Sequence, residues 1–388
     1  MVHRVLIIGG GIGGLTATLA LRQAGFDVQV FEAVPQIKIV GAGLAIWSNA
    51  LKALRQIGLA DAIQAAGKPA AYRVIRAMSG EILAKVQVNH IGNGEHIALF
   101  HLHRGDLQMA LLKAVGEPTI QLGARCVGFR QDDEGVWAQF ADGREVQGDL
   151  LVGADGVHSV IRQQLFSDAR LRLVGQSSWR GLAQIDAEQL TGGGAGETWG
   201  IGQRIGLIPM NHGRVYWFLT RNAPPGGELQ STAFGRKQYM QELVKGWHEP
   251  IPSMIQATAA QTIIHTELNE LESLGQWHRG RVVLLGDAAH AMTPNLGQGA
   301  CQAIEDAVTL GQCLKEAGDL AASLDLYESK RVLRVRRIVA DSYRFGAVAH
   351  NEIAPPSLLR GEPFQNIFES IYVEPLKWIL RDDQDAYK

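Results

Sequence analysis

The segment RVLIIGGGIGGLTATLALRQAGFDVQVFEA, residues 4–33, constrains the fold more strongly than any other part of the chain. Its apolar start predicts a strand, and its glycine cluster predicts a tight turn. The next run, with Leu15 and Leu19 on one stripe, predicts a helix that Gly25 closes. A second apolar run ends at Glu32 and predicts another strand. This order predicts a βαβ unit, whose two strands are parallel.

The glycine turn has the spacing of a dinucleotide-binding loop. Gly9, Gly11 and Gly14 satisfy G-x-G-x-x-G, in which the glycines permit the turn, close approach to a pyrophosphate and helix–strand packing. The following helix offers free N–H groups to that pyrophosphate. Glu32, 18 residues after Gly14, is placed to accept hydrogen bonds from a ribose, and an acid there argues against a 2′-phosphate. A purely structural turn is the alternative, and NAD and FAD both stay open on this motif alone.

Length and composition indicate an ordinary globular protein of two domains, or of one domain with a large insertion. The chain has 388 residues, 46% of them apolar and 20% charged, with a net charge of −2, which argues against nucleic acid as a partner. Cys126, Cys301 and Cys313 show neither zinc-ligand spacing nor an even count, and they suit a reducing cytoplasm. Nothing in the sequence resembles a signal peptide or a membrane span of about 20 apolar residues.

Strand and helix patterns divide the chain into three parts. The alternation over 127–151 predicts a small β meander, and further strand patterns fill 172–276. A βαβ-like pattern resumes at RVVLLGD, and long helical patterns follow. We therefore predict an α/β (α+β) fold. Its Rossmann-like domain is formed by 1–171 and 277–388 with C-terminal helices, and 172–276 form an inserted mixed β-sheet domain. Ser48 is predicted to cap one short helix.

Two further motifs lie at predicted strand ends, GADGVHSVIR at 153–162 and LGDAAHAMTPNLGQGA at 285–300. Together with the first turn, they imply a ligand long enough to touch three strand ends of one sheet, which favours FAD over a nicotinamide dinucleotide. The three motifs, in this order and with these separations, resemble the FAD-dependent class A monooxygenases, the para-hydroxybenzoate hydroxylase-like group. The resemblance spans nearly the whole chain.

The resemblance implies a flavoprotein hydroxylase, an oxidoreductase in which NADH or NADPH binds transiently and reduces FAD. Oxygen would then pass from a C4a-hydroperoxyflavin to a small aromatic or heteroaromatic substrate. The protein would supply orientation and a dry site. A monomer or a homodimer is expected.

The resemblance also assigns the cofactor contacts. Arg104 and Gln108 would reach the pyrophosphate and ribityl region, and Asp155 would lie near the phosphates and the path of NAD(P)H. Asp287 would bind ribityl hydroxyls, although it could also serve as a helix N-cap. The predicted cofactor-binding residues are Gly9, Gly11, Gly13, Gly14, Glu32, Ala33, Gly43, Arg104, Gln108, Cys126, Asp155, Asp287, Gly297, Gln298 and Gly299.

The last glycine turn has an electrostatic role as well. Reduced flavin carries negative charge near N1 and C2=O, and the helix N-terminus after Gly297 would stabilise it, typically by roughly 0.3 to 1 kcal/mol.

His158 and His290 follow strand-end acids, but no nucleophile or metal-ligand spacing accompanies them, so we interpret both as structural. Cys126 is interpreted as a small buried residue that touches adenine through its backbone, as the matching position does in the family.

Arg204, Tyr216 and Pro294 are the predicted catalytic residues. Arg204 and Tyr216 would orient the substrate if the strand register brings them to one face, and Pro294 would line the flavin. Ordinary cross-strand contacts are an equally good interpretation of the first two. Within the family the chain is most similar to FAD-dependent urate hydroxylases, through SSWRGLAQID, Arg204, GRVYWF and TPNLGQG. Ser178 replaces an asparagine that contacts the substrate in those enzymes, so the likeness is incomplete. Urate is therefore one candidate substrate and no more.

Two alternative functions stay open. The same fold could epoxidise or reduce a prenyl-type lipid, with FQNIFESIYVEPLKWIL at 364–380 as a membrane-facing helix, although core packing is the better interpretation of that stretch. A flavin-binding regulator with little turnover is the other alternative.

Overall fold

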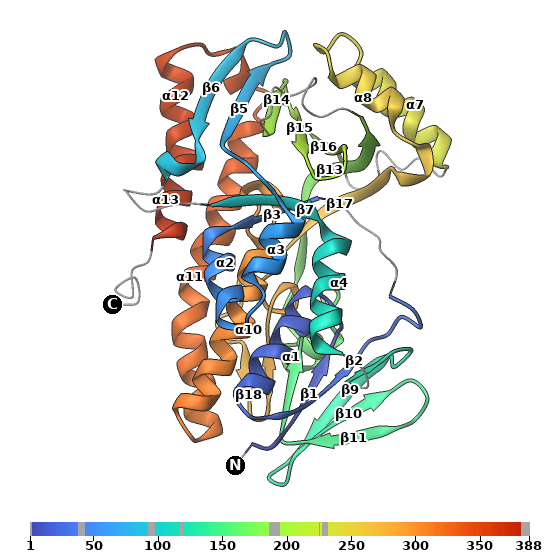
Figure 1. The fold of residues 1–388 in the computed structure, drawn as a ribbon, viewed down its shortest axis with the longest axis vertical. Helices are drawn as coiled ribbons and strands as arrows, with labels where there is room; N and C mark the ends of the chain where they lie inside the picture. Colours follow the sequence, from blue (N-terminus) through green and yellow to red (C-terminus); the bar gives the residue numbers. More distant parts are fainter. Residues whose placement is uncertain are drawn as a thin grey trace.

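The computed structural model of the chain describes residues 2–37, 43–91, 98–116, 119–185, 195–224, 226 and 232–381. Figure 1 shows two β-sheets stacked along the long axis, with the glycine-rich N-terminal unit at one end and the second sheet at the other. The long helix α11 (Leu320–Ala349) runs beside both of them.

The first sheet has six strands in the order β18-β19-β12-β1-β2-β8, and every neighbouring pair except β18–β19 is parallel. Its central strand β1 is fully buried from Val5 to Ile7, because helices cover one side of the sheet and a meander lies on the other. This sheet confirms the predicted Rossmann-like α/β domain. The strands are β1 (Arg4–Ile8), β2 (Asp27–Phe31), β8 (Ile120–Gln121), β12 (Leu150–Gly153), β18 (His278–Arg279) and β19 (Val282–Leu284).

Strands β1, β12 and β19 are direct neighbours and run in the same direction. Their carboxyl ends therefore lie at one edge of the sheet, and each continues into one of the three sequence motifs. The prediction that three strand ends of one sheet meet is confirmed.

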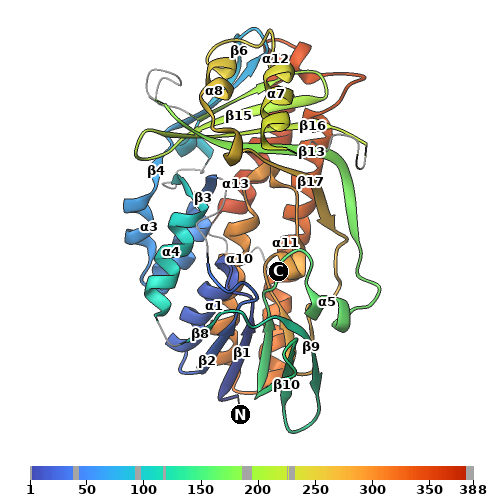
Figure 2. The same cartoon turned by 90° about the vertical axis from the view of Figure 1, so that its right-hand side faces the viewer.

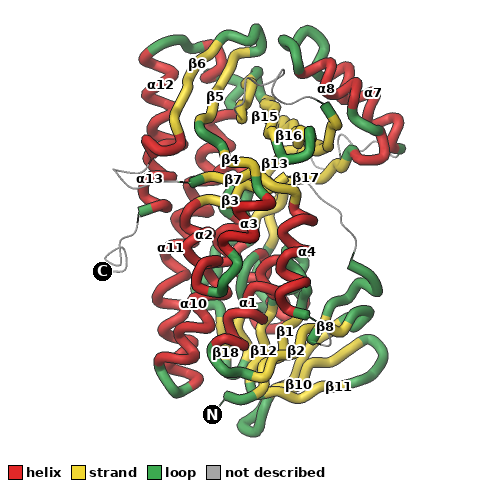
Figure 3. The backbone as a smooth tube through the Cα atoms, viewed as in Figure 1, coloured by secondary structure: helices red, strands yellow, loops and turns green. Residues whose placement is uncertain are grey.

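Helices α1 and α10 pack against each other beside this sheet, and the antiparallel strands β9, β10 and β11 form the predicted meander. Figure 3 separates the helical layer from the strands of the meander. The elements are α1 (Ile12–Gln23), α2 (Ser48–Gln56), α3 (Ala60–Ala66), α4 (Arg104–Val115), α5 (Val160–Leu165), α10 (Gly299–Glu316), β9 (Cys126–Gln131), β10 (Val136–Phe140) and β11 (Glu145–Gly148).

The prediction that Ser48 caps a helix is wrong. Ser48 is already the first helical residue of α2, and the capping position belongs to Trp47 in extended conformation. No side-chain cap closes this helix, and the buried Ser48 hydroxyl has no partner among the described residues. The sequence pattern was misleading because a good capping residue one position inside the helix looks the same as one at its boundary.

The second sheet has seven strands in the order β17-β13-β16-β15-β14-β5-β6. It is mixed, because β14 and β5 pair in parallel while the other pairs are antiparallel. Two of its strands, β5 and β6, come from outside the predicted segment 172–276, whose boundaries stay a prediction. The strands are β5 (Tyr72–Ala77), β6 (Ile82–Gln87), β13 (Leu171–Gln184), β14 (Ala195–Trp199), β15 (Gln203–Pro209), β16 (Arg214–Asn222) and β17 (Ile264–Leu271).

Alternation along these strands divides the sheet into two faces. Trp179 and Trp217 are completely buried on the face that α7 (Ala233–Leu243) and α8 (Ile251–Ala257) cover. The opposite face is turned toward the first sheet, and Figure 2 shows this layering. A small third sheet lies between them, made of β3 (Gly43–Trp47), β4 (Lys68–Pro69) and β7 (Leu99–His103).

The C-terminal stretch 364–380 forms part of the core. Phe364, Tyr372 and Leu376 are buried in the cluster that also holds Trp199, so the core-packing interpretation of this stretch is confirmed. No helix of the described residues is long and apolar enough to cross a membrane. The remaining elements are α9 (Asp287–His290), α12 (Glu362–Phe368), α13 (Glu374–Leu380), a π-helical turn (Glu369–Val373) and 3-10 turns η1 (Val88–Ile91), η2 (Ala260–Thr262), η3 (Pro294–Leu296) and η4 (Pro356–Leu358).

Candidate functional site

The first glycine turn is held in place by hydrogen bonds from neighbouring elements. The Gly10 N–H donates to Glu32 Oε2 at 2.7 Å, and the Gln108 side chain donates to the Gly10 carbonyl at 3.1 Å. Gly9 has φ of +110°, and a Cβ at that position would lie 2.3 Å from the Ala154 carbonyl oxygen. Only glycine fits there. The structure therefore brings the predicted residues Glu32 and Gln108 to this turn.

The outer side of the same turn is open. A Cβ built on Gly11 would meet no atom within 4 Å, although its φ of −77° is accessible to any residue. Helix α1 begins at the next residue and has no side-chain cap, so its first N–H groups have no side-chain acceptor. A helix N-terminus of this kind attracts anions, which fits a pyrophosphate.

The second turn is closed by its own aspartate. Asp155 accepts hydrogen bonds from the Val160 N–H at 2.8 Å and from the hydroxyl of Ser159, which is itself the N-cap of α5. Burial raises the pKa of Asp155, while these hydrogen bonds oppose the rise. The main chain at Ala154 lies against Gly9. Asp155 thus lies beside the first turn, and its contacts with phosphates and with NAD(P)H stay predictions.

The third turn leaves its aspartate free. Gly286 adopts φ of +60° ahead of α9, and Asp287 is exposed. The residues that the structure describes make no hydrogen bond to the Asp287 carboxylate, which does not cap the helix. The N-cap interpretation of Asp287 is therefore wrong, and the carboxylate is available for the hydroxyl groups of a ligand.

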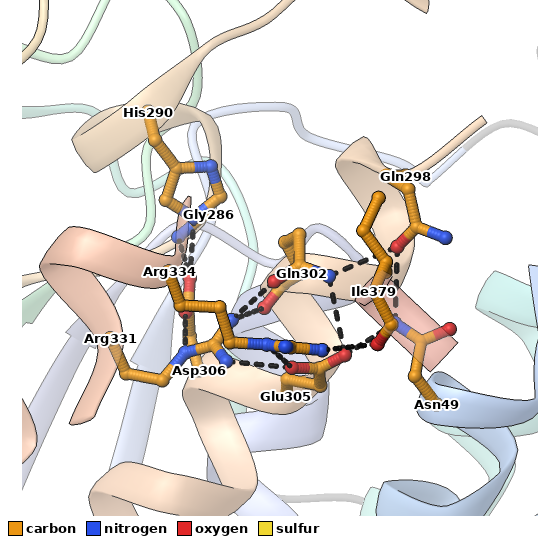
Figure 4. Close-up of polar contacts among 10 residues, drawn as sticks. All are labelled: Asn49, Gly286, His290, Gln298, Gln302, Glu305, Asp306, Arg331, Arg334 and Ile379. Carbon is orange, nitrogen blue, oxygen red and sulfur yellow. Dashed lines mark hydrogen bonds and ion pairs between the residues drawn. The ribbon is translucent and has the colours of Figure 1, made fainter. Parts of the chain in front are cut away.

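A buried polar network joins this turn to the start of α10 (Figure 4). Asp306 accepts hydrogen bonds from the Gly286 N–H at 3.0 Å, from His290 Nε2 at 2.6 Å and from Arg331 Nε at 2.7 Å. His290 is thus structural, as predicted. Burial alone would raise the pKa of Asp306, but His290 and Arg331 hold it below its ordinary value. The network fixes the turn that carries Asp287.

At the other end of the network lies Gln298, whose carboxamide oxygen accepts hydrogen bonds from Asn49 and from Gln302, each at 3.0 Å. Gln298 precedes Gly299, the first residue of α10, and this helix also lacks a side-chain cap. Several buried polar atoms of this region have no partner among the described residues. They are Trp47 Nε1, Ser48 Oγ, Asn49 Oδ1 and Gln298 Nε2.

The remaining predicted cofactor residues lie around these turns. Arg104 is the exposed first residue of α4, whose later residue Gln108 contacts the glycine turn, and Ala33 directly follows Glu32. Cys126 is buried, its thiol donates to the Gly128 carbonyl at 3.3 Å, and burial raises its pKa. A buried, protonated thiol agrees with the prediction of a packing residue.

The observed register brings Arg204 and Tyr216 to the same face of the second sheet. Arg204 is the cross-strand partner of Thr220, and Tyr216 lies four residues before Thr220 on the same strand. Side chains alternate along a strand, so all three point the same way. The ring of Phe218 lies between them, with its centre 5.5 Å from the Arg204 guanidinium and 6.2 Å from the Tyr216 ring.

This face lies close to the nucleotide-binding part of the chain. Arg204 donates a hydrogen bond to the Asn295 carboxamide, in the η3 turn that begins with the exposed Pro294. On the other side, a Cβ at Gly43 would lie 2.5 Å from a Tyr216 ring carbon, so Gly43 packs directly on that ring. The three predicted catalytic residues and Gly43 are therefore brought together.

The charge of Arg204 is paired within the protein. Glu197 Oε2 accepts from Arg204 at 2.7 Å, and Glu197 Oε1 accepts from Arg73 at 2.9 Å. Burial would raise the pKa of Glu197, but Arg204 and Arg73 lower it, so the carboxylate stays ionised. Burial followed by the nearby arginines lowers the pKa of His101 and of His350 to about 3, so both are neutral at pH 7. The group of two arginines and one carboxylate carries a net positive charge.

Sequence reasoning missed Arg73, Glu197 and Arg180. Arg180 is the cross-strand partner of Phe218 and therefore shares the face of Arg204. It donates to Thr266 at 2.7 Å, and it forms no ion pair with a carboxylate of the described residues. Arg180 stands inside the quoted segment SSWRGLAQID, but only the strand pairing shows which face it occupies.

The donors and acceptors at the three turns fit FAD. Two uncapped helix N-termini, the open side of Gly11, the free Asp287 carboxylate and the unpartnered polar atoms near Gln298 follow one edge of the first sheet. A dinucleotide with a polar ring at one end needs such contacts along its whole length.

Comparisons with known proteins agree with this geometry. Residues 3–342 match the protein family described as FAD binding domain. The chain is 43% identical over 350 residues to aurachin C monooxygenase/isomerase of Stigmatella aurantiaca, with 90% of each chain covered. It is 36% identical over 355 residues to FAD-dependent urate hydroxylase of Klebsiella pneumoniae, covering 90% of this chain and 91% of the other. Among solved structures, Klebsiella pneumoniae HpxO complexed with FAD and uric acid matches with a TM-score of 0.87 and 31% identity, over 97% of this chain and 96% of that one.

Proposed function

The chain belongs to the FAD binding domain family and is a flavoprotein monooxygenase, and on this premise we propose that it uses NADH or NADPH and O₂ to hydroxylate a small aromatic or heteroaromatic molecule. The family confirms the resemblance predicted from the three strand-end motifs. FAD, when bound, accepts reducing equivalents from NAD(P)H and activates O₂. The protein orients the substrate and excludes water.

The observation that carries this proposal is the contact between Arg204 and Asn295. It joins the inner face of the second sheet to the turn of Pro294, at which the resemblance places the flavin. A flat ring held on that face would lie beside the reacting edge of the cofactor. Orientation of this kind can account for a large part of the rate of an enzyme.

The substrate-facing groups have distinct roles. Burial, which a nearby Arg180 opposes, raises the pKa of Tyr216 to about 12, so the hydroxyl stays protonated and is available to donate a hydrogen bond to the substrate. Arg180 supplies the positive charge for an anionic oxygen, because Glu197 already neutralises part of the charge of Arg204. Pro294 lines the flavin face with an exposed ring.

The cofactor contacts follow the three turns. The N–H groups after Gly11 bind the pyrophosphate, with Arg104 and Gln108 beside it, and Glu32 accepts from the adenosine ribose. Asp287 binds ribityl hydroxyls. The start of α10 at Gly299 donates to the pyrimidine ring.

Urate is one candidate substrate. The relative of 36% identity is named FAD-dependent urate hydroxylase, and the Klebsiella pneumoniae structure that holds FAD and uric acid has a similar fold. Ser178, the cross-strand neighbour of Thr220 on the face of Arg204, stands where those enzymes carry an asparagine. The relative of 43% identity is named aurachin C monooxygenase/isomerase, so aurachin C is a second candidate.

The decisive experiment measures NADH and NADPH oxidation together with O₂ uptake in the presence of uric acid, aurachin C, and salicylate-like and quinoline-like compounds. We expect one class of compound to stimulate both rates and to gain one oxygen atom. Mass spectrometry detects that atom as a product heavier by about 2 Da when ¹⁸O₂ replaces O₂, because about one atom is transferred per turnover. Slow flavin reduction that no compound stimulates would overturn the proposal and favour a flavin-binding regulator.

A further inference from the structure

We propose that Glu305 and Arg331 set the orientation of the Gln298 carboxamide, so that its nitrogen donates a hydrogen bond to the flavin. Glu305, Asn49 and Gln302 would then be positioning residues for the cofactor, although none of them need touch it. This inference rests on the FAD site of the proposed function and is independent of the substrate. Figure 4 shows the side chains concerned, with the Gln298 nitrogen pointing away from the other nine residues.

The network contains two groups whose hydrogen-bonding character cannot change. The Glu305 carboxylate only accepts, and the Arg331 guanidinium only donates. Glu305 Oε2 accepts from Arg331 at 2.6 Å, which leaves Glu305 Oε1 as the acceptor for Asn49 and, at 3.2 Å, for Gln302. Arg331 also donates to Gln302 Oε1 at 2.7 Å. Both amides must therefore turn their nitrogens toward Glu305.

These two fixed amides determine the orientation of the third. The nitrogens of Asn49 and Gln302 each donate to Gln298 Oε1 at 3.0 Å. A reversed Gln298 amide would face two donors with a third donor, which is unfavourable in a buried site. The observed orientation leaves Gln298 Nε2 buried and without a partner among the described residues, in a side chain only 1% exposed.

An unpartnered buried donor is expensive unless a ligand supplies the acceptor. The edge of a pyrimidine ring, with its carbonyl and nitrogen acceptors, would satisfy a donor of this kind. An N–H donor in this position stabilises the negative charge of a reduced flavin, because the charge develops on that ring.

The same network reaches the C-terminal helix. Arg334 donates to Glu305 Oε2 at 3.3 Å and to the Ile379 carbonyl in α13 at 2.6 Å. Burial alone would raise the pKa of Glu305, but Arg331 and Arg334 lower it, so the carboxylate stays ionised. The last described helix therefore supports the charge that orients Gln298.

The test compares the midpoint potential of the bound flavin and the dissociation constant of FAD in the wild-type holoenzyme, Gln298→Leu, Glu305→Gln and the double variant, without substrate. We expect Gln298→Leu to lower the potential and to weaken FAD binding roughly tenfold, since one hydrogen bond to the cofactor is lost. Glu305→Gln should shift both quantities in the same direction, because a neutral amide lets Asn49 turn over. In the Gln298→Leu background it should cause no further shift.

Two further variants keep the test decisive. Asn49→Leu removes one donor to Gln298 without removing a charge, and it replaces Glu305→Gln if that protein does not fold. Gln312→Leu is the matched control, because the exposed Gln312 also links α10 to α2, through Gln56, but lies away from Gln298. Equal shifts in both backgrounds, or lower thermal stability with an unchanged potential, would overturn the inference. Failure to hydroxylate any compound would bear only on the proposed function, because no substrate is present here.

Discussion

Glu197 and Arg204 form a buried ion pair, with 2.7 Å between Glu197 Oε2 and a terminal nitrogen of Arg204. The second carboxylate oxygen binds Arg73, so one acid holds two arginines on the face that we assign to the substrate. The pairing explains how an arginine that is only 1% exposed can be tolerated in the middle of a sheet.

Replacement of Glu197 by glutamine should destabilise the protein strongly. Two buried guanidinium groups would lose their counter-charge, and breaking a buried pair in this way typically costs roughly 3 to 5 kcal/mol. Chemical denaturation of the apoprotein measures the change in the free energy of unfolding. Glu81→Gln, which removes an exposed partner of Arg360, is the control and should cost less than about 1 kcal/mol. Equal losses of unfolding free energy in the two variants would show that Glu197 is not the counter-charge of Arg73 and Arg204.

The two buried histidines make the stability dependent on pH. His101 has its pKa lowered from 6.5 to about 3, by burial and then by Arg73, so the unfolded chain binds a proton that the folded protein does not. The contribution of neutral His101 to the free energy of unfolding is fully present above pH 6.5 and is lost as the pH falls toward 3. The loss is about 1.4 kcal/mol per pH unit for each such histidine.

Urea denaturation at a series of pH values between 4 and 7, a window of roughly 3 units that includes the ordinary pKa of histidine, tests this expectation. His101→Leu should reduce the slope of unfolding free energy against pH, while His350, whose pKa is also lowered to about 3, keeps its own share. His158→Leu, at an exposed position, serves as the control and should leave the slope unchanged. Identical slopes for wild type and His101→Leu would show that His101 titrates normally in the folded protein.

Replacement of Gly11 by alanine should separate cofactor binding from folding. The φ of Gly11 is −77°, and an added Cβ meets nothing within 4 Å, so the apoprotein should keep its stability. The methyl group would instead occupy the space that we assign to the pyrophosphate, and FAD affinity should fall at least about tenfold. Flavin fluorescence titration and the melting temperature of the apoprotein give the two readouts. Gly275→Ala, also in open space but on the surface, should change neither.

The nucleotide-binding half of the fold was predictable because its signals are local. The glycine spacing, the acid at Glu32 and the two later strand-end motifs each lie within a few residues of the strand that positions them, and parallel neighbours bring their ends to one edge. Asp287 illustrates the limit of this reasoning. Sequence alone could not show whether its carboxylate caps α9 or is free, because both uses require an acid at the same position.

The half of the site that we assign to the substrate could not be predicted because its contacts are not local. Arg73 lies in β5, more than 120 positions before the Glu197 to which it donates, and no periodicity marks these residues as partners. Arg204 and Tyr216 share a face only because of the observed β15–β16 register, and a slip of one residue would have separated them.

Replacement of Tyr216 by phenylalanine should slow catalysis without a change in its pH dependence. The pKa of about 12 keeps the hydroxyl protonated throughout the usual assay range, so we expect it to donate a hydrogen bond to the substrate and not to serve as a base. Loss of that bond should lower kcat roughly tenfold, with the ring packing on Gly43 preserved. The matched control Tyr343→Phe, on α11, should leave kcat unchanged. If the variant loses an ionisation from the kcat profile below pH 10, about two units under this pKa, a catalytic phenolate would be required instead.

Replacement of Arg180 by methionine should weaken the binding of anionic substrates in particular. Arg180 faces the same side as Arg204, yet it donates only to Thr266 and has no carboxylate partner among the described residues. A charge-assisted hydrogen bond to the substrate would be lost, so KM should rise roughly 10- to 100-fold with a smaller change in kcat. Arg180→Lys should recover part of the effect, because the charge remains while the planar fork of donors is lost. Arg172→Met, on the same strand but paired with Glu270, provides the control. An unchanged KM of Arg180→Met for every accepted substrate would show that the substrate binds without the charge of Arg180. Among the described residues of this face, only the group of Arg73, Arg204 and Glu197 would then offer the substrate a net charge.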